Sequence, residues 1–273
     1  MSAVGEGLVA LVTGATGGLG AAVAQRLGAE GVAVVCVGRT ADGHPERPGS
    51  LRDTVYAIQA NGGRAVPVVA DLADPAARAG AVLEAEAAFG PIDILVNEAA
   101  AMFAMPFDRF SERRFALAFE LNVRAPFDLA QRVLPGMRAR RRGWILNVSS
   151  QVARLPAGPP FDPVDVHGGT LLYGMTKAAL DRLSVGLAAE VFDDGIAVNA
   201  LAPAVACGGG AGPAGWREPA EPPEVFAEAA LVLCTGDPRI FTGRVTSSRA
   251  VLAEVARTPR TLDGRRPFLE PLA

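Results

Sequence analysis

The chain has few cysteines, few histidines and no surplus of positive charge. Its 273 residues include three cysteines and two histidines, and the formal net charge is −3 at pH 7. Nucleic-acid binding needs an excess of Lys and Arg to neutralise phosphates, so this charge balance argues against a nucleic-acid partner. Cys36, Cys207 and Cys234 form no CxxC pair, which favours free thiols in a reducing compartment.

Long apolar runs are also missing. No stretch approaches the ~18 residues that a membrane span requires, and the first residues lack the basic segment of a secretion signal. We therefore expect a soluble, cytoplasmic protein with no membrane partner. His44 and His167 stand far apart without a cysteine pair, so the sequence predicts no metal site.

Short apolar runs rich in Val, Ile and Leu alternate with stretches of helical periodicity. The predicted strands are 8–13, 32–37, 65–69, 92–97, 143–150, 195–201 and 243–247. Strands separated by helices form βαβ units with right-handed crossovers. The sequence therefore predicts an α/β fold, a doubly wound Rossmann-type parallel sheet of about seven strands with helices on both faces. The length suits one domain over residues 1–273.

Two segments, 151–170 and 203–223, are rich in Pro and Gly. That composition predicts no regular helix or strand in either of them. Both follow the carboxyl end of a predicted strand, which is the edge where open α/β sheets bind ligands. We interpret them as active-site loops that act as lids, with disordered linkers as the alternative.

A glycine-rich turn, "TGATGGLG" at 13–20, follows the first predicted strand. Gly14 can permit a tight turn, Gly18 a close approach of the backbone to a pyrophosphate, and Gly20 close packing of a helix on the sheet. The helix N-terminus then faces the anion. The turn predicts a dinucleotide site, although a turn without a ligand has the same pattern.

Tyr173 and Lys177 are four positions apart in a helical stretch, so they share one helix face. Further motifs are "DL" at 71–72, "NEAA" at 97–100, "LNV" at 121–123 and "NVSS" at 147–150. With TGxxxGxG and YxxxK, they resemble the short-chain dehydrogenase/reductase family, in the family's order, over residues 7–248. The resemblance implies an NAD(P)-dependent oxidoreductase that acts on CH–OH and C=O groups.

The resemblance also implies four catalytic residues. Tyr173 is the general acid/base, and Lys177 holds the nicotinamide ribose and lowers the pKa of the Tyr173 phenol, which is ordinarily near 10. Ser150 hydrogen-bonds the substrate oxygen, and Asn122 supports a water that relays protons to Lys177. The implied reaction is NADPH-dependent reduction of a ketone or aldehyde, or the reverse oxidation of an alcohol.

The second predicted strand bears on the choice of cofactor. NAD enzymes usually place an acidic residue there, whereas a nearby Arg accommodates a 2′-phosphate. This chain has Gly38 followed by Arg39, which favours NADP, with NAD as the alternative and Asp42 a little further along. The resemblance implies a cofactor site made of Gly14, Thr16, Gly18, Leu19, Gly20, Arg39, Asp71, Leu72, Asn97, Ala99, Tyr173, Lys177 and Pro203.

The chain departs from the family pattern at several points. Glu98 stands where the family has an amide, and Ala100 and Ala204 stand where it has glycines. A buried, unpaired carboxylate is costly, so we expect Glu98 to find a partner or to titrate at raised pH. The segment between Ser150 and Tyr173 is also longer than the resemblance leads us to expect.

Substrate, assembly and activity stay open at this stage. Six apolar side chains suggest an apolar or bulky substrate, or simply the packing of a helix; they are Met102, Phe103, Met105, Phe107, Leu155 and Phe161. His167 is either a substrate contact or a solvated loop residue. The resemblance implies a homodimer or homotetramer. The alternative functions are a catalytically weak dinucleotide-binding module with a regulatory or scaffolding role, and a dehydratase or epimerase.

Overall fold

The computed structural model describes residues 4–43, 49–204 and 221–270, and within them one seven-stranded sheet has the order β3-β2-β1-β4-β5-β6-β7. Every neighbouring pair in the sheet is parallel. The strands are β1 (Val9–Thr13), β2 (Ala33–Gly38), β3 (Arg64–Val69), β4 (Ile94–Asn97), β5 (Gly143–Val148), β6 (Ile196–Ala202) and β7 (Val245–Ser247). The predicted doubly wound parallel sheet is confirmed.

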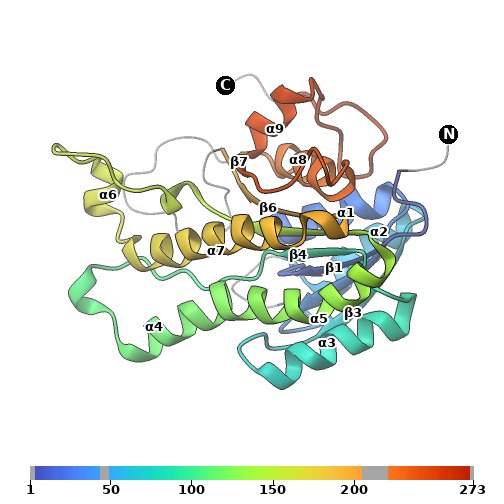
Figure 1. Cartoon of the computed structure of the whole chain (residues 1–273), viewed down its shortest axis with the longest axis horizontal. Helices are drawn as coiled ribbons and strands as arrows, with labels where there is room; N and C mark the ends of the chain where they lie inside the picture. Colours follow the sequence, from blue (N-terminus) through green and yellow to red (C-terminus); the bar gives the residue numbers. More distant parts are fainter. Residues whose placement is uncertain (1–3, 44–48, 205–220, 271–273) are drawn as a thin grey trace.

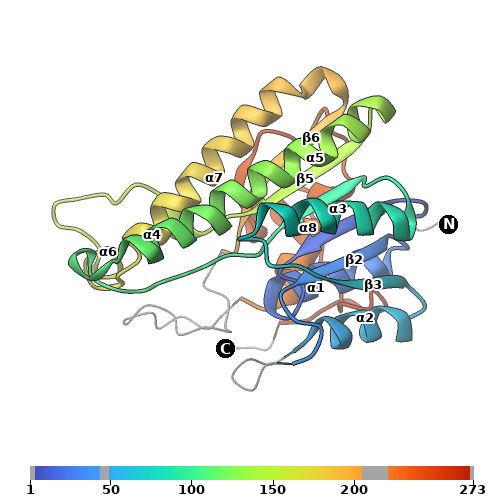
Figure 2. The ribbon, with the colours of Figure 1, turned by 90° about the horizontal axis from the view of Figure 1, so that it is seen from below.

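Helices cover both faces of the sheet (Figures 1 and 2). One face carries α1 (Gly18–Ala29), α2 (Leu51–Ala60) and α8 (Pro223–Thr235), and the other carries α3 (Pro75–Phe89), α5 (Ala125–Arg140) and α7 (Leu171–Glu190). Shorter elements are α4 (Glu112–Phe119), α6 (Pro163–His167), α9 (Ser248–Glu254), three turns of 3₁₀-helix (Phe107–Arg109, Gln151–Ala153, Phe192–Asp194) and a π-helical turn (Glu120–Arg124).

Two apolar cores lie between these helices and the sheet. Successive strand residues point to opposite faces, so Val12 joins the core under α1 and α8 while Leu11 joins the core under α3 and α5. All five residues of β1 are buried, as expected for a parallel strand covered on both sides. This double burial is why the strands of the sequence read as continuous apolar runs.

The strand order reverses direction at β1, which pairs with β2 on one side and with β4 on the other. Such a switch point opens a crevice at the carboxyl ends of the strands, where α/β proteins bind their ligands. Gly14 follows β1 and Glu98 follows β4, so the residues after these two strands meet at the crevice.

The prediction that segment 151–170 contains no regular element is wrong. It contains the 3₁₀ turn Gln151–Ala153 and the one-turn helix α6. Proline is tolerated at the first position of a helix because its missing N–H has no partner there, so Pro163 can begin α6. Arg154 and Asp165 form an ion pair of 3.0 Å that ties the two parts of the segment together. Of segment 203–223, residues 205–220 lie outside the described residues.

The cysteines of the described residues are free. Cys36 and Cys234 are buried thiols, in agreement with the prediction, and Cys207 lies outside the described residues. No described helix has the length and apolar character needed to cross a membrane.

Candidate active site

The glycine-rich turn forms one wall of the site. Gly14 has a φ of 71°, which only glycine adopts at low cost, and a side chain at Gly20 would collide with the carbonyl group of Gly14. Gly18 has a φ of 56°, and a Cβ there would meet nothing within 4 Å. The turn is therefore closely packed at Gly14 and Gly20 and open beside Gly18, which fits the approach of a phosphate to the N-terminus of α1.

Glu98 forms the facing wall, at the end of β4. A side chain on Gly14 would overlap its Oε2, and the backbone N–H of Gly20 donates to its carboxylate. The Thr13 hydroxyl accepts hydrogen bonds from the backbone N–H groups of Glu98 (2.9 Å) and Ala99 (3.2 Å). The expectation that Glu98 finds a partner is confirmed, and its partner is the glycine-rich turn itself.

Tyr173 and Lys177 lie one turn apart near the start of α7. Lys177 is almost fully buried, its Nζ donates to the carbonyl of Val148 at 2.6 Å, and this ammonium lies 5.4 Å from the centre of the Tyr173 ring. A Cβ on Gly174 would collide with the carbonyl of Val152, so glycine lets α7 press against the 3₁₀ turn that follows Ser150. The fold thus brings Tyr173, Lys177 and the Ser150 turn to the end of β5.

Burial and neighbouring charges shift the titration of this group. Burial raises the pKa of Glu98 to about 7, although Lys177 and the Gly20 N–H favour the carboxylate. Burial lowers the pKa of Lys177 to about 8, against the opposing effect of Glu98 and Asp181. Burial raises the pKa of Tyr173, and the Glu98 charge raises it further. This direction is opposite to the lowering that the resemblance implies with an oxidised nicotinamide bound, because the phenol is desolvated and lies near a carboxylate; the lowering in the complex stays a prediction.

Asn122 lies in the π-helical turn that joins α4 to α5. Its Nδ2 donates to the Ala101 carbonyl (2.9 Å) and to the Thr176 Oγ1 (2.9 Å), while its Oδ1 accepts from the Ala101 N–H (2.7 Å). Both amide hydrogens are therefore used. Thr176 immediately precedes Lys177, so Asn122 connects the loop after β4 to α7. Single π-helical turns of this kind are frequent at functional sites.

Other predicted cofactor residues have local partners. Asn97 is buried and donates to the Asn147 Oδ1 at 2.8 Å, and the Leu72 carbonyl accepts from Arg78 at 2.7 Å. Exposed Asp71 accepts from the Ala73 N–H at 3.1 Å. The Pro203 carbonyl accepts from the Gln151 Nε2 at 3.1 Å, which links the loop after β6 to the turn after β5.

Arg39 is exposed at the end of β2, on the far side of the glycine-rich turn from Glu98. A Cβ on Gly38 would collide with Thr16 and crowd Leu51, so a larger residue does not fit there. Asp42 forms an exposed ion pair with Arg52 at 2.8 Å. Asp42, the carboxylate that the sequence analysis noted after Arg39, is therefore paired with a cation.

The mouth of the site carries apolar side chains with a cation beside them, since the Arg114 guanidinium lies 5.9 Å from the centre of the Phe103 ring. Among the candidate pocket residues, Phe107 is 76% exposed, Leu155 is 87% exposed and Phe161 is 52% exposed, so they do not pack a helix. The loop after β4 joins the segment before α7 through the Met105 N–H, which donates to the Gly169 carbonyl at 3.1 Å. Figure 1 shows α4 and α6 at the same end of the molecule as the start of α7. His167 is exposed at the end of α6.

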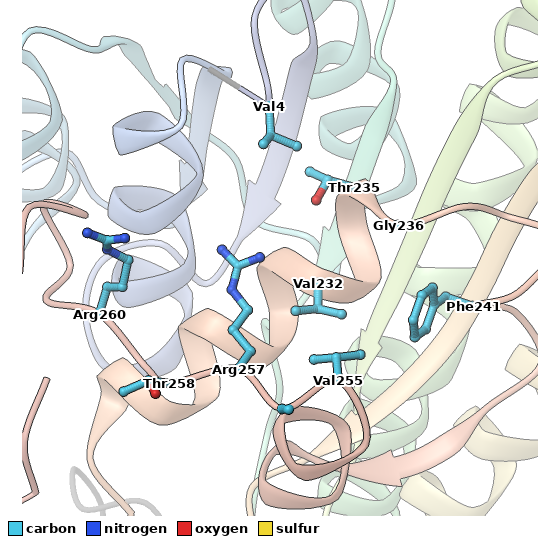
Figure 3. Close-up of a pocket in the computed structure, with 10 residues that line it drawn as sticks. Val4, Val232, Thr235, Gly236, Phe241, Val255, Arg257, Thr258 and Arg260 are labelled. Carbon is cyan, nitrogen blue, oxygen red and sulfur yellow. The ribbon is translucent and has the colours of Figure 1, made fainter. Parts of the chain in front are cut away.

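A separate groove of about 690 Å³ lies away from these residues (Figure 3). It is lined by residues of α8, by Val4 and by the segment after α9, including Val232, Val255 and Arg257. Gly236 on its wall accepts from the indole of Trp144, at the amino end of β5. The groove is thus at the opposite edge of the sheet from Tyr173. No group of three or more His, Cys, Asp or Glu side chains in residues 4–43, 49–204 and 221–270 could hold a metal ion.

Sequence reasoning missed the residues that hold the site together. Thr13 fixes the backbone of Glu98 and Ala99, and Thr176 fixes Asn122. Both lie inside or beside recognised motifs, since Thr13 opens the glycine-rich turn and Thr176 precedes Lys177. Their positions within or beside the motifs could have drawn attention to Thr13 and Thr176. The sequence does not show which groups their hydroxyls bind.

Comparisons with known proteins agree with this architecture. A family profile described as short chain dehydrogenase matches residues 8–208, so the chain belongs to the short-chain dehydrogenase family. A short chain dehydrogenase from Pseudocercospora fijiensis (strain CIRAD86) is 34% identical over 200 residues, an alignment that covers 72% of this chain and 59% of the relative. The chain spans just under three fifths of the length of the first curated relatives that it matches.

Solved structures share the fold over almost the whole chain. The crystal structure of a short chain dehydrogenase from Mycobacterium thermoresistibile is 30% identical, with a TM-score of 0.80 and coverage of 96% of this chain and 92% of the other. A metagenomic short-chain oxidoreductase in complex with NADP is 28% identical, with a TM-score of 0.73 and coverage of 89% of this chain and 97% of the other.

Proposed function

We propose that the protein is an NADPH-dependent oxidoreductase that reduces a ketone or an aldehyde, or oxidises the corresponding alcohol. The observation that carries this proposal is the Tyr173–Lys177 pair, which α7 holds over the end of β5, beside Ser150 and next to the crevice at the switch point. Membership of the short-chain dehydrogenase family supports the same reaction class.

The site fits a dinucleotide in most respects. The open space beside Gly18 and the N-terminus of α1 suit a pyrophosphate, and the Lys177 ammonium at the end of β5 supports a contact with the nicotinamide ribose. Exposed Arg39 suits a 2′-phosphate, and the Asp42–Arg52 ion pair weakens the repulsion that a free carboxylate would cause. The structural neighbour solved with NADP also supports NADP over NAD.

The proposed chemistry uses three side chains of this chain. Ser150 orients the carbonyl oxygen of the substrate, and Tyr173 donates its phenolic proton to that oxygen. Because burial and Glu98 raise the pKa of Tyr173, the phenol is protonated at neutral pH, which is the form that reduction requires. A reduced nicotinamide, when bound, supplies the hydride. Lys177 then returns a proton to Tyr173 after the alcohol leaves.

The proposed substrate is apolar or bulky. Met102, Phe107, Leu155 and Phe161 are exposed at the mouth of the site, where an apolar ligand would cover them. The charged side chains of Arg154 and Asp165 beside Leu155 pair with each other at 3.0 Å, so they do not call for a charged substrate.

The first experiment is titration of the purified protein with NADPH and then NADH, followed by nicotinamide fluorescence. We expect NADPH to bind more tightly than NADH and to be consumed with at least one member of a panel of apolar ketones and aldehydes. Binding without turnover across the panel would favour a dinucleotide-binding module without catalysis. Absence of binding by both nucleotides would overturn the proposal.

We also propose that the protein self-associates through its long helices. Phe115 on α4, Phe127 on α5, and Met175 and Val185 on α7 are each at least 40% exposed, although they are large and apolar. Multi-angle light scattering is expected to give the mass of a dimer or tetramer. A monomer at micromolar concentration would contradict this.

A further inference from the structure

Glu98 packs against Gly14 and Gly20 of the glycine-rich turn, whose open side beside Gly18 suits a pyrophosphate. Its carboxylate touches Gly14 and accepts the N–H of Gly20, in the first turn of α1. Its backbone is held by the Thr13 hydroxyl, at 2.9 Å from the Glu98 nitrogen and 3.2 Å from the Ala99 nitrogen. The carboxylate is therefore held at the N-terminus of α1, close to the place proposed for the pyrophosphate.

The charges around Glu98 come from α7. Lys177 and Tyr173 face it from that helix, and Asp181, one turn further, acts on Lys177. From β1 and α1 the neighbours are the Thr13 hydroxyl, backbone groups and glycine α-carbons. Burial raises the pKa of Glu98 to about 7, so both of its protonation states are populated near neutral pH.

A pyrophosphate on the glycine-rich turn would add negative charge beside this carboxylate. Like charges in a partly desolvated site repel strongly, and the simplest relief is protonation of the carboxylate. We propose that Glu98 is a proton-controlled determinant of dinucleotide binding, in which the crevice accepts the cofactor with Glu98 protonated. This inference rests on the proposed function, because it concerns the same cofactor site.

The proposal has a defined proton balance. At a pH where free Glu98 is ionised, each binding event takes one proton from solvent, which forms an O–H bond on the carboxylate. No electrons are exchanged in this step. At a pH where Glu98 is already protonated, binding takes up no proton at this site. By linkage, the Kd rises with pH above the titration of the free protein, by up to about tenfold per pH unit.

The experiment is calorimetric titration with NADH and NADPH from about pH 5.5 to about pH 8.5, the range that brackets an ionisation near neutrality. Repetition in buffers of different ionisation enthalpy gives the number of protons taken up. NADH is included because the 2′-phosphate of NADPH itself titrates near pH 6. The variants are Glu98→Gln, which is neutral and of similar shape, and Glu98→Asn. The matched control is Glu84→Gln, which removes an exposed carboxylate from α3.

We expect the unmodified protein and the Glu84→Gln control to take up close to one proton per bound NADH at high pH. The Glu98→Gln variant is expected to lose the uptake that belongs to Glu98, so that any proton still taken up near pH 8 belongs to Lys177. Circular dichroism spectra establish that each variant is folded. If a variant does not fold, the proton count of the unmodified protein still tests the proposal. Binding of NADH without proton uptake, and with the same pH dependence in all proteins, would overturn this inference and leave the proposed function intact. Failure of every protein to bind either nucleotide would overturn both.

Discussion

The Lys177 ammonium donates to the main-chain oxygen of Val148 at 2.6 Å, so α7 is fixed to the end of β5 by a buried, charge-assisted hydrogen bond. Tyr173 lies one turn earlier on the same helix, and its ring centre is 5.4 Å from that ammonium. The position of the phenol is therefore set by the sheet rather than by the exposed segment that precedes α7. This relationship makes the role of Tyr173 directly testable.

Replacement of Tyr173 with Phe is expected to lower kcat by about 10² to 10⁴, the usual contribution of a positioned proton donor. The ring and its packing remain, so NADPH binding should stay within a few-fold of the original. Steady-state kinetics with a substrate from the carbonyl panel measure the first quantity, and fluorescence titration measures the second. Tyr56→Phe, the same change at an exposed position of α2, is the control and should leave kcat unchanged. A Tyr173→Phe variant with full turnover would remove Tyr173 from the mechanism.

Replacement of Arg39 with Asp is expected to shift the cofactor preference toward NADH. A guanidinium attracts the 2′-phosphate, whereas a carboxylate repels it and can bind the ribose hydroxyls. The ratio of kcat/KM for NADPH to that for NADH should fall by about tenfold or more, equivalent to about 1.4 kcal/mol. Arg52→Ala, which frees Asp42 from its ion pair, should shift the ratio in the same direction by less. An unchanged ratio in the Arg39→Asp variant would refute the assignment.

Replacement of Asn122 with Ala is expected to lower the free energy of unfolding by about 2 to 4 kcal/mol. The change leaves both backbone groups of Ala101 without the partner they have now, and unsatisfied buried polar groups cost about 1 to 3 kcal/mol each. Urea denaturation monitored by circular dichroism measures the loss. Asn61→Ala, at the exposed end of α2, should change stability by less than about 0.5 kcal/mol. Equal losses in the two variants would show that the Asn122 network does not stabilise the fold.

Glu98 should also make stability depend on pH. Folding raises the pKa of this carboxyl from 4.5 to about 7, so the folded state binds the proton more tightly than the unfolded state. The free energy of unfolding therefore falls as pH rises through this window. Glu98→Gln is expected to be more stable than the unmodified protein by about 1 to 2 kcal/mol at pH 8. This figure is reduced because Glu98 is partly exposed and because the variant loses the attraction between Glu98 and Lys177.

The Glu98 difference should vanish below about pH 4.5, where the carboxyl is protonated in both states. Thermal unfolding without nucleotide, at a series of pH values, gives the comparison, with Glu84→Gln as the control. Parallel stability curves for Glu98→Gln and the unmodified protein from pH 4.5 to pH 8 would contradict the raised pKa.

The layers of the fold could be predicted from the sequence because each strand is buried on both faces. The predicted strand 32–37 agrees with the strand Ala33–Gly38 to within one residue at each end. The agreement is close because a continuous Val-rich run is visible in the sequence without tertiary information. The helix α6 could not be predicted in the same way. It is one turn long, begins at a proline and has no apolar periodicity, so composition alone indicated a loop.

The sequence brought the candidate site residues together, but it did not show their electrostatics. Motif order placed Tyr173, Lys177 and the glycine-rich turn together, and the departure at Glu98 was visible as a replaced amide. The direction of the Tyr173 pKa shift was not predictable, because it depends on burial and on the distance to a carboxylate from another strand. Similarly, the sequence does not show that the side-chain amide of Asn122 is occupied by Ala101 and Thr176.

The two walls of the crevice come from parts of the chain that are synthesised at different times, because β4 lies beside β1. Two strands and three helices separate these neighbours along the chain. A polypeptide that has emerged from the ribosome only as far as β3 already contains Gly14 and Gly20, yet it lacks Glu98 and the wall that faces them. Pairing of strands this far apart in sequence carries the entropic cost of closing a long loop. A nucleotide can therefore contact both walls of the crevice only after β4 has docked.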